Sequence, residues 1–246
     1  MKNKKQQSAF SLVEVLMAVG ILAVGLLLVA TMFPAAIYMT TVASERTMAA
    51  IVADEAFAKI QIYEVNGITT PSTDPCSSCT DWGDEMGTKI AESEFSYPPV
   101  DPCGGSSQYY WSALYRKTNN NPADNEYQIT VFVARKMNPS LTYKDNTRNP
   151  VNWPVPIEIG IAAGSKDSPT MDIDGGDENL VNPSATIVDN ETGKLYTVVK
   201  RGDGGDNVVT LDRNLESDIS DIWLIPPSES GGKNAGVEVY QRIIKF

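Results

Sequence analysis

A long apolar stretch near the start of the chain limits its fold more than any other feature. The 25 residues from 15 to 39 contain no charged side chain, and a helix of that length can cross the roughly 30 Å hydrocarbon core of a bilayer. Lys2, Lys4 and Lys5 precede this stretch, and Glu14 stands at its start. A secretory signal peptide has a shorter apolar run that ends at a small-residue cleavage site, which is not evident here. We therefore expect the stretch to remain on the mature protein.

The residues just before the apolar stretch carry a second pattern. A basic leader and a small residue, Ala9, come before Phe10-Ser11-Leu12-Val13-Glu14. This arrangement resembles the class III signal of type IV pilins and type II secretion pseudopilins. The resemblance implies that a prepilin peptidase cuts between Ala9 and Phe10 and methylates the new amine, which makes Glu14 the fifth mature residue that the signal requires. The family usually has Gly where this chain has Ala9.

The resemblance also implies a role for Glu14 in assembly. A carboxylate that enters hydrocarbon is costly unless it is paired. Two interpretations remain open: Glu14 lies among the lipid headgroups, or it pairs with the free amine of Phe10 on a neighbouring subunit and so sets the register of a filament. Within the family, the sequence of the apolar stretch looks most like that of minor pilins of the PilV type and of the related I-type minor pseudopilin.

The helix is predicted to continue beyond the membrane. An apolar stripe at helical spacing follows the span, and Gly67 is a plausible end; the stripe consists of Met48, Val52, Ala56, Ile60 and Tyr63. The chain is therefore divided into a leader peptide (1–9), a transmembrane or filament-core helix (10–39) and its amphipathic continuation (40–66). Pro34 removes a backbone hydrogen bond, so we expect a kink or local unwinding there.

Residues 67–108 are rich in Pro, Gly, Ser and Asp and are expected to be irregular. They contain all three cysteines, Cys76, Cys79 and Cys103. A structural zinc site needs four Cys or His ligands, and this chain has no histidine. A disulfide is favoured in an oxidising compartment, from Cys103 to Cys76 or Cys79 or between the two closer cysteines, with one thiol left over.

Residues 109–246 are expected to form an antiparallel β-rich domain, because their apolar residues alternate instead of following a helical period. Strands are predicted over 109–117, 126–136, 155–162, 208–212, 221–225 and 237–245, with a hairpin over 185–201 that turns at 189–193. The fold class is therefore α+β, with the long N-terminal helix covering one face of the sheet.

An acidic segment in this domain is a candidate calcium loop. Asp172, Asp174, Asp177 and Glu178 supply four carboxylates beside Gly175 and Gly176, and calcium prefers oxygen ligands on a flexible backbone. The resemblance adds that some pseudopilins bind calcium in their globular domain. The spacing does not fit an EF-hand, and solvated turns have the same composition.

Composition and charge oppose several other functions. The formal net charge is −11, with 20 basic and 31 acidic residues, and becomes about −14 without the three leader lysines. Such a surface repels phosphate backbones, so nucleic-acid binding is not expected. The absence of histidine and of nucleophile or phosphate-binding motifs opposes catalysis.

The sequence therefore predicts a minor pilin or pseudopilin that contacts other pilins or pseudopilins through its N-terminal helix. It would lie in the inner membrane with its amino end in the cytoplasm and its β-rich domain in the periplasm. The alternatives are a minor pseudopilin of a type II secretion system that engages secreted substrate, and a membrane-anchored periplasmic binding module or enzyme.

Overall fold

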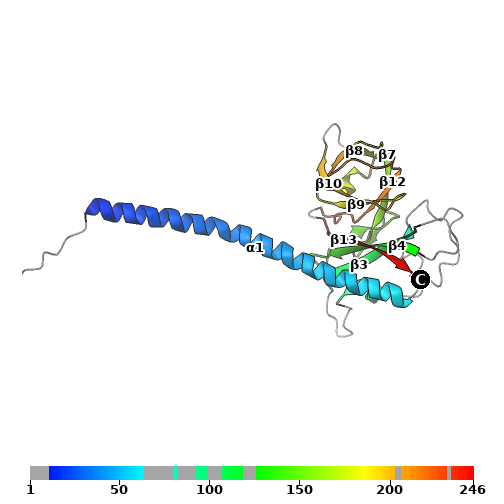
Figure 1. Ribbon diagram of the computed structural model, residues 1–246, viewed down its shortest axis with the longest axis horizontal. Coiled ribbons are helices and arrows are strands. Elements are labelled where there is room, and N and C mark those ends of the chain that lie inside the picture. The colour runs from blue at the N-terminus through cyan, green and yellow to red at the C-terminus, as the bar shows by residue number, and fades with distance from the viewer. Residues whose placement is uncertain are drawn as a thin grey trace, which may run out of the picture. The chain divides into compact units, whose positions relative to one another are not determined.

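The fold is an N-terminal helix followed by an antiparallel β domain, as the α+β prediction states. The computed structural model describes residues 11–63, 80–81, 92–98, 107–118, 126–202, 207–231 and 234–246. The chain divides into two compact units, Met1–Glu45 and Arg46–Phe246. Helix α1, Leu12–Tyr63, runs through both (Figure 1).

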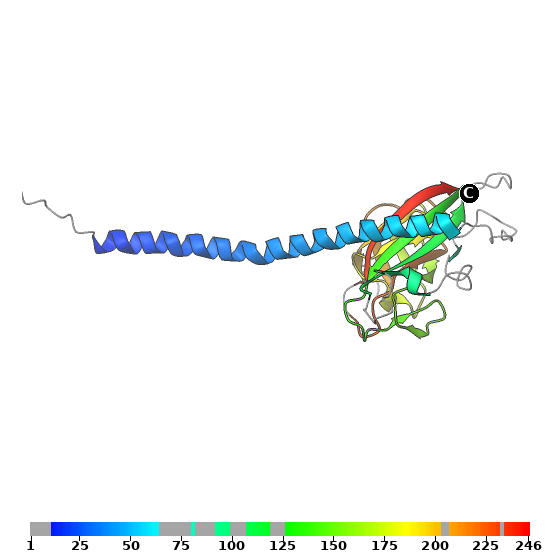
Figure 2. The ribbon, with the colours of Figure 1, turned by 90° about the horizontal axis from the view of Figure 1, so that it is seen from below.

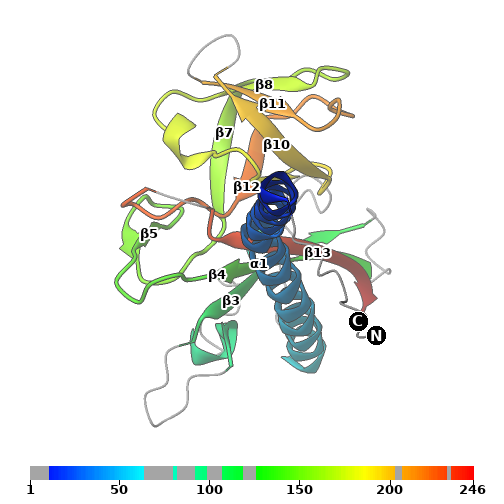
Figure 3. The ribbon, with the colours of Figure 1, turned by 90° about the vertical axis from the view of Figure 1, so that its left-hand side faces the viewer.

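The second part of α1 packs on the β domain through one narrow face. Every third or fourth residue there is 0–2% exposed, which gives the buried set Ala49, Val52, Ala53, Ala56, Phe57 and Ile60. Three alanines in this set let the helix backbone approach the sheet closely. Tyr63, which the sequence places on the same stripe, is instead 41% exposed at the end of the helix. Figures 2 and 3 show this part of α1 lying against the sheet that contains β3 (Tyr109–Lys117), β4 (Glu126–Arg135) and β13 (Gly236–Lys245).

The sheet under α1 is entirely antiparallel. Its order is β1-β3-β4-β13, and β2 also pairs with β3. The strands are β1 (Thr80–Asp81), β2 (Ser96–Tyr97), β3 (Tyr109–Lys117), β4 (Glu126–Arg135) and β13 (Gly236–Lys245), and the short helix η1 (Glu92–Phe95) precedes β2. Alternate residues of β3 and β4, such as Trp111 and Val131, face α1 and form one core with it.

A second β structure, a closed barrel, occupies the chain between β4 and β13. Its strands follow the order β10-β11-β8-β7-β12-β9, with β9 paired to β10. They are β7 (Ile157–Ala163), β8 (Thr170–Ile173), β9 (Thr186–Asp189), β10 (Leu195–Arg201), β11 (Val208–Leu211) and β12 (Asp221–Leu224). Apolar side chains fill its interior, among them Ile157, Ile159, Tyr196 and Val209. The barrel is therefore a packed core and leaves no exposed sheet edge of its own.

The barrel is inserted into what is otherwise a long hairpin. The Arg135 N–H donates to the Ala235 carbonyl at 2.8 Å, so the chain leaves and re-enters the sheet at neighbouring points. Barrel residues Val188 and Trp223 share a buried cluster with Leu114 and Phe132, which lie on the sheet face opposite to α1. The sheet is thus covered on one face by α1 and on the other by the barrel.

The turn between β9 and β10 adds polar contacts between barrel and sheet. The Gly193 carbonyl accepts from the side-chain amides of Gln241 (2.6 Å) and Gln128 (3.3 Å), and Arg116 donates to the Glu191 carbonyl (2.8 Å). Gly193 has φ +68°, and a Cβ there would lie 2.9 Å from Oε1 of Gln128. This position therefore requires glycine both for its backbone and for the close approach.

The structure corrects the sequence prediction in several places. The β domain holds a sheet and a barrel, whereas the sequence predicts one sheet. Strand β8 was not predicted, and β7 begins at Ile157, two residues later than expected. Short elements β1, η1 and β2 fall within 67–108, where irregular structure was expected, and a two-stranded sheet of β5 (Tyr143–Lys144) and β6 (Pro150–Val151) was also missed.

Candidate functional site

The first part of α1 presents an apolar surface on all sides. Helix α1 is long and apolar enough to cross a membrane, and its most apolar stretch has no buried residue. The exposed side chains include Leu16, Ile21, Leu26, Phe33 and Met39. A helix that is apolar all round is typical of a membrane span or of the core of a larger assembly.

Polar groups within this apolar part are few and are satisfied locally. Hydroxyls of Thr31, Thr40 and Thr41 donate to carbonyls three or four residues earlier, at 2.8, 2.8 and 2.9 Å. Pro34 lies in the middle and leaves one carbonyl without its helical donor. The backbone remains α-helical through Pro34, so the local unwinding that was one expectation is not observed. The kink at Pro34 stays a prediction.

Glu14 lies in the first turn of α1. The backbone N–H of Glu14 donates to the Ser11 carbonyl at 3.0 Å, and the residue is exposed. A carboxylate near a helix N-terminus interacts favourably with the helix dipole. The next charged residue along the chain is Glu45, so the helix carries one acidic group at its start and then thirty residues without charge. Ala9 and Phe10 lie outside the described residues.

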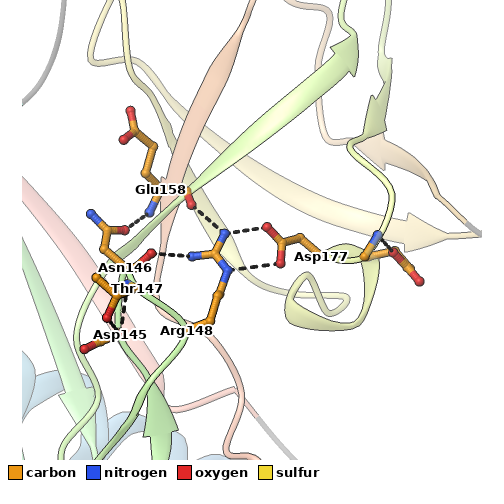
Figure 4. A network of polar contacts seen from close by, with 8 residues as sticks. Asp145, Asn146, Thr147, Arg148, Glu158 and Asp177 are labelled. Carbon is orange, nitrogen blue, oxygen red and sulfur yellow. Dashed lines mark hydrogen bonds and ion pairs between the residues drawn. The ribbon is translucent and has the colours of Figure 1, made fainter.

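The four candidate calcium ligands are not brought together as a site. Asp172 belongs to β8, and the Asp177 carboxylate forms a two-point ion pair with Arg148 (Figure 4). Glu178 accepts from the Gly176 N–H at 2.7 Å. Asp174 lies over Gly160, because a Cβ atom added to Gly160 would be 2.5 Å from Oδ2 of Asp174. Within the described parts of the chain, no three His, Cys, Asp or Glu side chains gather to hold a metal ion.

Arg148, in the loop between β5 and β6, contacts both the acidic segment and strand β7 of the barrel. Its guanidinium also donates to the Glu158 carbonyl (3.0 Å), while Asn146 accepts from the Glu158 N–H (2.6 Å) (Figure 4). The backbone N–H and the carbonyl of Glu158 in β7 are thus both hydrogen-bonded to side chains from the β5–β6 loop. Arg148 has φ +64°, which is uncommon for a residue with a side chain. Sequence reasoning missed it because its partners lie 10 and 29 residues away.

The β5–β6 loop is held by Asp145. Its Oδ1 accepts from the N–H groups of Thr147 (2.9 Å) and Asn149 (2.8 Å). Burial raises the pKa of Asp145, but hydrogen bonds from Thr147 and Asn149 outweigh it, so that its pKa lies below the ordinary value. The Asp145 carboxylate therefore stabilises the loop that carries Arg148.

Glu158 is the other carboxylate of this network with a shifted pKa. Burial, followed by the nearby Asp221 carboxylate, raises the pKa of Glu158, and Arg148 opposes this shift. Its Oε1 accepts from the Asn190 amide (3.0 Å), and Asn190 in turn accepts from the buried Trp223 indole N–H (2.9 Å). These contacts attach loops to the outer side of the barrel. They indicate that the network stabilises the fold.

Charged side chains also tie α1 to the β domain. Lys59 binds Glu55 (2.8 Å) and Glu94 (2.9 Å). Arg242 on β13 binds Asp54 at 2.5 Å, and its guanidinium lies 4.5 Å from the centre of the Phe57 ring. These contacts flank the buried face of α1.

Comparison with known families gives one match. Residues 4–30 match the family model described as the prokaryotic N-terminal methylation motif. The chain begins with a prepilin signal of the type IV pilin and pseudopilin kind. No curated protein and no solved structure matches the chain significantly.

The prepilin signal accounts for the apolar surface of α1. It implies processing by a prepilin peptidase and assembly with other pilins, and together with one apolar N-terminal helix it indicates an inner-membrane anchor. The matched range contains Ala9, Phe10 and Glu14. The matched range ends before Pro34 and does not cover that residue. The resemblance to PilV-type minor pilins stays a prediction.

The prepilin signal leaves the other predicted sites without support. Cys76, Cys79 and Cys103 lie outside the described residues, so their disulfide stays a prediction. Calcium binding also stays a prediction, although Asp177 is engaged by Arg148. The match points to a structural, pilin-type protein and away from an enzyme.

Proposed function

We propose that the chain is a minor pilin or pseudopilin, a structural subunit that helps to initiate a type IV pilus-like filament or forms its tip. The observation that carries this proposal is the prepilin signal joined to a helix whose apolar first part has no buried residue. Such a helix needs lipid before assembly and other apolar helices after it. The two environments are similarly apolar, so transfer from one to the other has a small net cost.

Processing and orientation follow from the same region. The peptidase would cut between Ala9 and Phe10 and methylate the amine of Phe10. Lys2, Lys4 and Lys5 would hold the leader on the cytoplasmic side, and the β domain would lie in the periplasm. Ala9 is small enough for close approach to the scissile bond in the place of the usual Gly.

Glu14 would set the position of the subunit in the filament. The amine of Phe10 on a neighbouring subunit would neutralise the Glu14 carboxylate, which removes most of the cost of placing a charge in apolar surroundings. Uncleaved chains cannot supply that amine. Processing and assembly would therefore be linked through one ion pair.

The presence of the inserted barrel favours the interpretation that the chain is a specialised subunit, and not one that only repeats along a filament. It adds a second packed domain to the sheet and holds it in a fixed orientation through a shared apolar cluster. Such a domain suits partner recognition. A minor pseudopilin that engages secreted substrate in a type II secretion system is the second candidate, and a membrane-anchored binding module or enzyme is the third.

Glu14→Gln tests the proposal, with Glu45→Gln as the matched control at the other end of the uncharged stretch. We expect Glu14→Gln to be processed and inserted but to fall at least about tenfold in cross-linking to other pilins, a loss equivalent to roughly 1.4 kcal/mol. Glu45→Gln should cross-link as the wild type does. Equal cross-linking of all three proteins would contradict the proposal and favour an independent membrane anchor.

A further inference from the structure

A small cavity lies where the inserted barrel meets the sheet. Its volume is about 30 Å³, and it is bordered by Phe132 of β4, by Ser184 and Thr186 just before and at the start of β9, and by Asn234 with the first residues of β13. The cavity is thus at the point where the chain returns from the barrel to the sheet. It is separate from the apolar part of α1 and from the Arg148 network.

One polar side chain at this cavity, Asn234, has no hydrogen-bond partner among the described residues. Both the Nδ2 and Oδ1 atoms of Asn234 are buried, and neither has a hydrogen-bond partner in the part of the chain that the structure describes. An unpaired buried amide is costly, and buried polar atoms in folded proteins nearly always bond to protein or to ordered water. Asn234 therefore needs a partner that the described residues do not supply.

The backbone next to Asn234 also leaves its regular pairing. The register between β13 and β4 shifts between Gly236 and Glu238, which is the pattern of a β-bulge. A bulge leaves one residue out of the ladder, so its peptide groups are open to other partners. Ser184 and Thr186, which both carry a hydroxyl group, are among the residues that line the cavity.

We propose that this cavity binds an ordered water molecule, which accepts from Nδ2 of Asn234 and donates to its Oδ1 or to a neighbouring oxygen. A cavity needs about 10–15 Å³ to hold one water, so 30 Å³ is sufficient. A buried water usually makes about three hydrogen bonds. The two polar atoms of the Asn234 amide and the bulged backbone offer that number of polar groups. The water thereby links the return strand of the insertion to β9 of the barrel.

A high-resolution crystal structure of the full-length chain in a lipidic phase tests this proposal. We expect density for a water about 2.7–3.2 Å from the Asn234 amide. Asn234→Leu, which has a similar volume and no polar atom, should lose that density, whereas Asn234→Asp should keep it.

Two results would overturn the proposal. One is a cavity without density in the wild type, and the other is an Asn234 amide bonded directly to protein atoms. The wild-type structure alone decides both, so the test stands even where a variant fails to fold. Retention of the water in Asn234→Leu at an unchanged position would also count against the role of the amide.

Discussion

Glu158 is held in surroundings that favour its neutral form. Burial and the Asp221 carboxylate raise the pKa of Glu158 above its ordinary value of 4.5. The folded chain therefore binds this proton more tightly than the unfolded chain does. The contribution of Glu158 to stability is greatest at acid pH and declines as pH rises from 4.5 through the raised folded pKa.

Glu158→Gln should therefore raise the melting temperature of the full-length protein at neutral pH. Glutamine keeps an oxygen for the Asn190 amide and removes the charge. The difference from the wild type should shrink below pH 4.5, where the Glu158 carboxyl is already neutral. Glu216→Gln is the control, because hydrogen bonding to Lys194 lowers the pKa of Glu216, so its loss should leave stability unchanged or reduced. A Glu158→Gln protein less stable than the wild type at pH 7 would contradict this account.

Helix α1 changes its role along its length. Its first part has an apolar surface on all sides, whereas its second part buries a face of six residues against the sheet. Phe57 is the largest side chain of that face and is 2% exposed, with Arg242 of β13 over its ring. The attachment of α1 to the β domain therefore depends on a narrow stripe of side chains.

Phe57→Ala should destabilise the β domain by about 3–5 kcal/mol, because it leaves a cavity between α1 and the sheet and removes the contact with Arg242. Ile62→Ala is the matched control on the same helix, since Ile62 is 76% exposed, and should change stability by no more than about 0.5 kcal/mol. Chemical denaturation in detergent, followed by tryptophan fluorescence, measures both. Similar effects for the two variants would contradict the described packing of α1.

Most of the elements could be predicted from the sequence, because their patterns are local. The alternation in 109–117 gave β3 with its observed ends, and the hairpin over 185–201 became β9 and β10. Strand β8 was missed because Asp172 and the Asp- and Gly-rich residues that follow the strand favour a turn. The closure of the barrel could not be predicted, since a strand alternates in the same way in a barrel and in an open sheet.

The sites follow the same rule. Ala9, Phe10 and Glu14 form a local motif, and the match over 4–30 covers them. The Arg148 and Asp177 pair joins residues 29 positions apart, and the pairing of β4 with β13 spans the whole insertion. No local pattern in a single sequence reports such contacts.

The β domain behaves as one body with two cores on either side of a shared sheet. Phe132 and Leu114 contact the barrel, while neighbouring residues of the same strands contact α1. The insertion is therefore held by packing as well as by its two chain connections. This arrangement couples the stability of the barrel to that of the sheet.

Thermal unfolding of the β domain should therefore show one transition, with the same midpoint by near-ultraviolet circular dichroism and by hydrogen exchange of barrel and sheet amides. Phe132→Ala should lower that midpoint and should separate the unfolding transition of the barrel from that of the sheet. A wild-type protein whose barrel amides exchange well before its sheet amides would contradict the shared core.

The N-terminal residue of the protein recovered from membranes tests the central claim most directly. The N-terminal residue and the mass of the whole protein would be measured in samples from cells with and without a prepilin peptidase. The filament account predicts a chain that starts at methylated Phe10 in the first cells and keeps residues 1–9 in the second. A chain that retains Met1 to Ala9 in both would contradict it and would leave a fixed membrane anchor that carries a β domain.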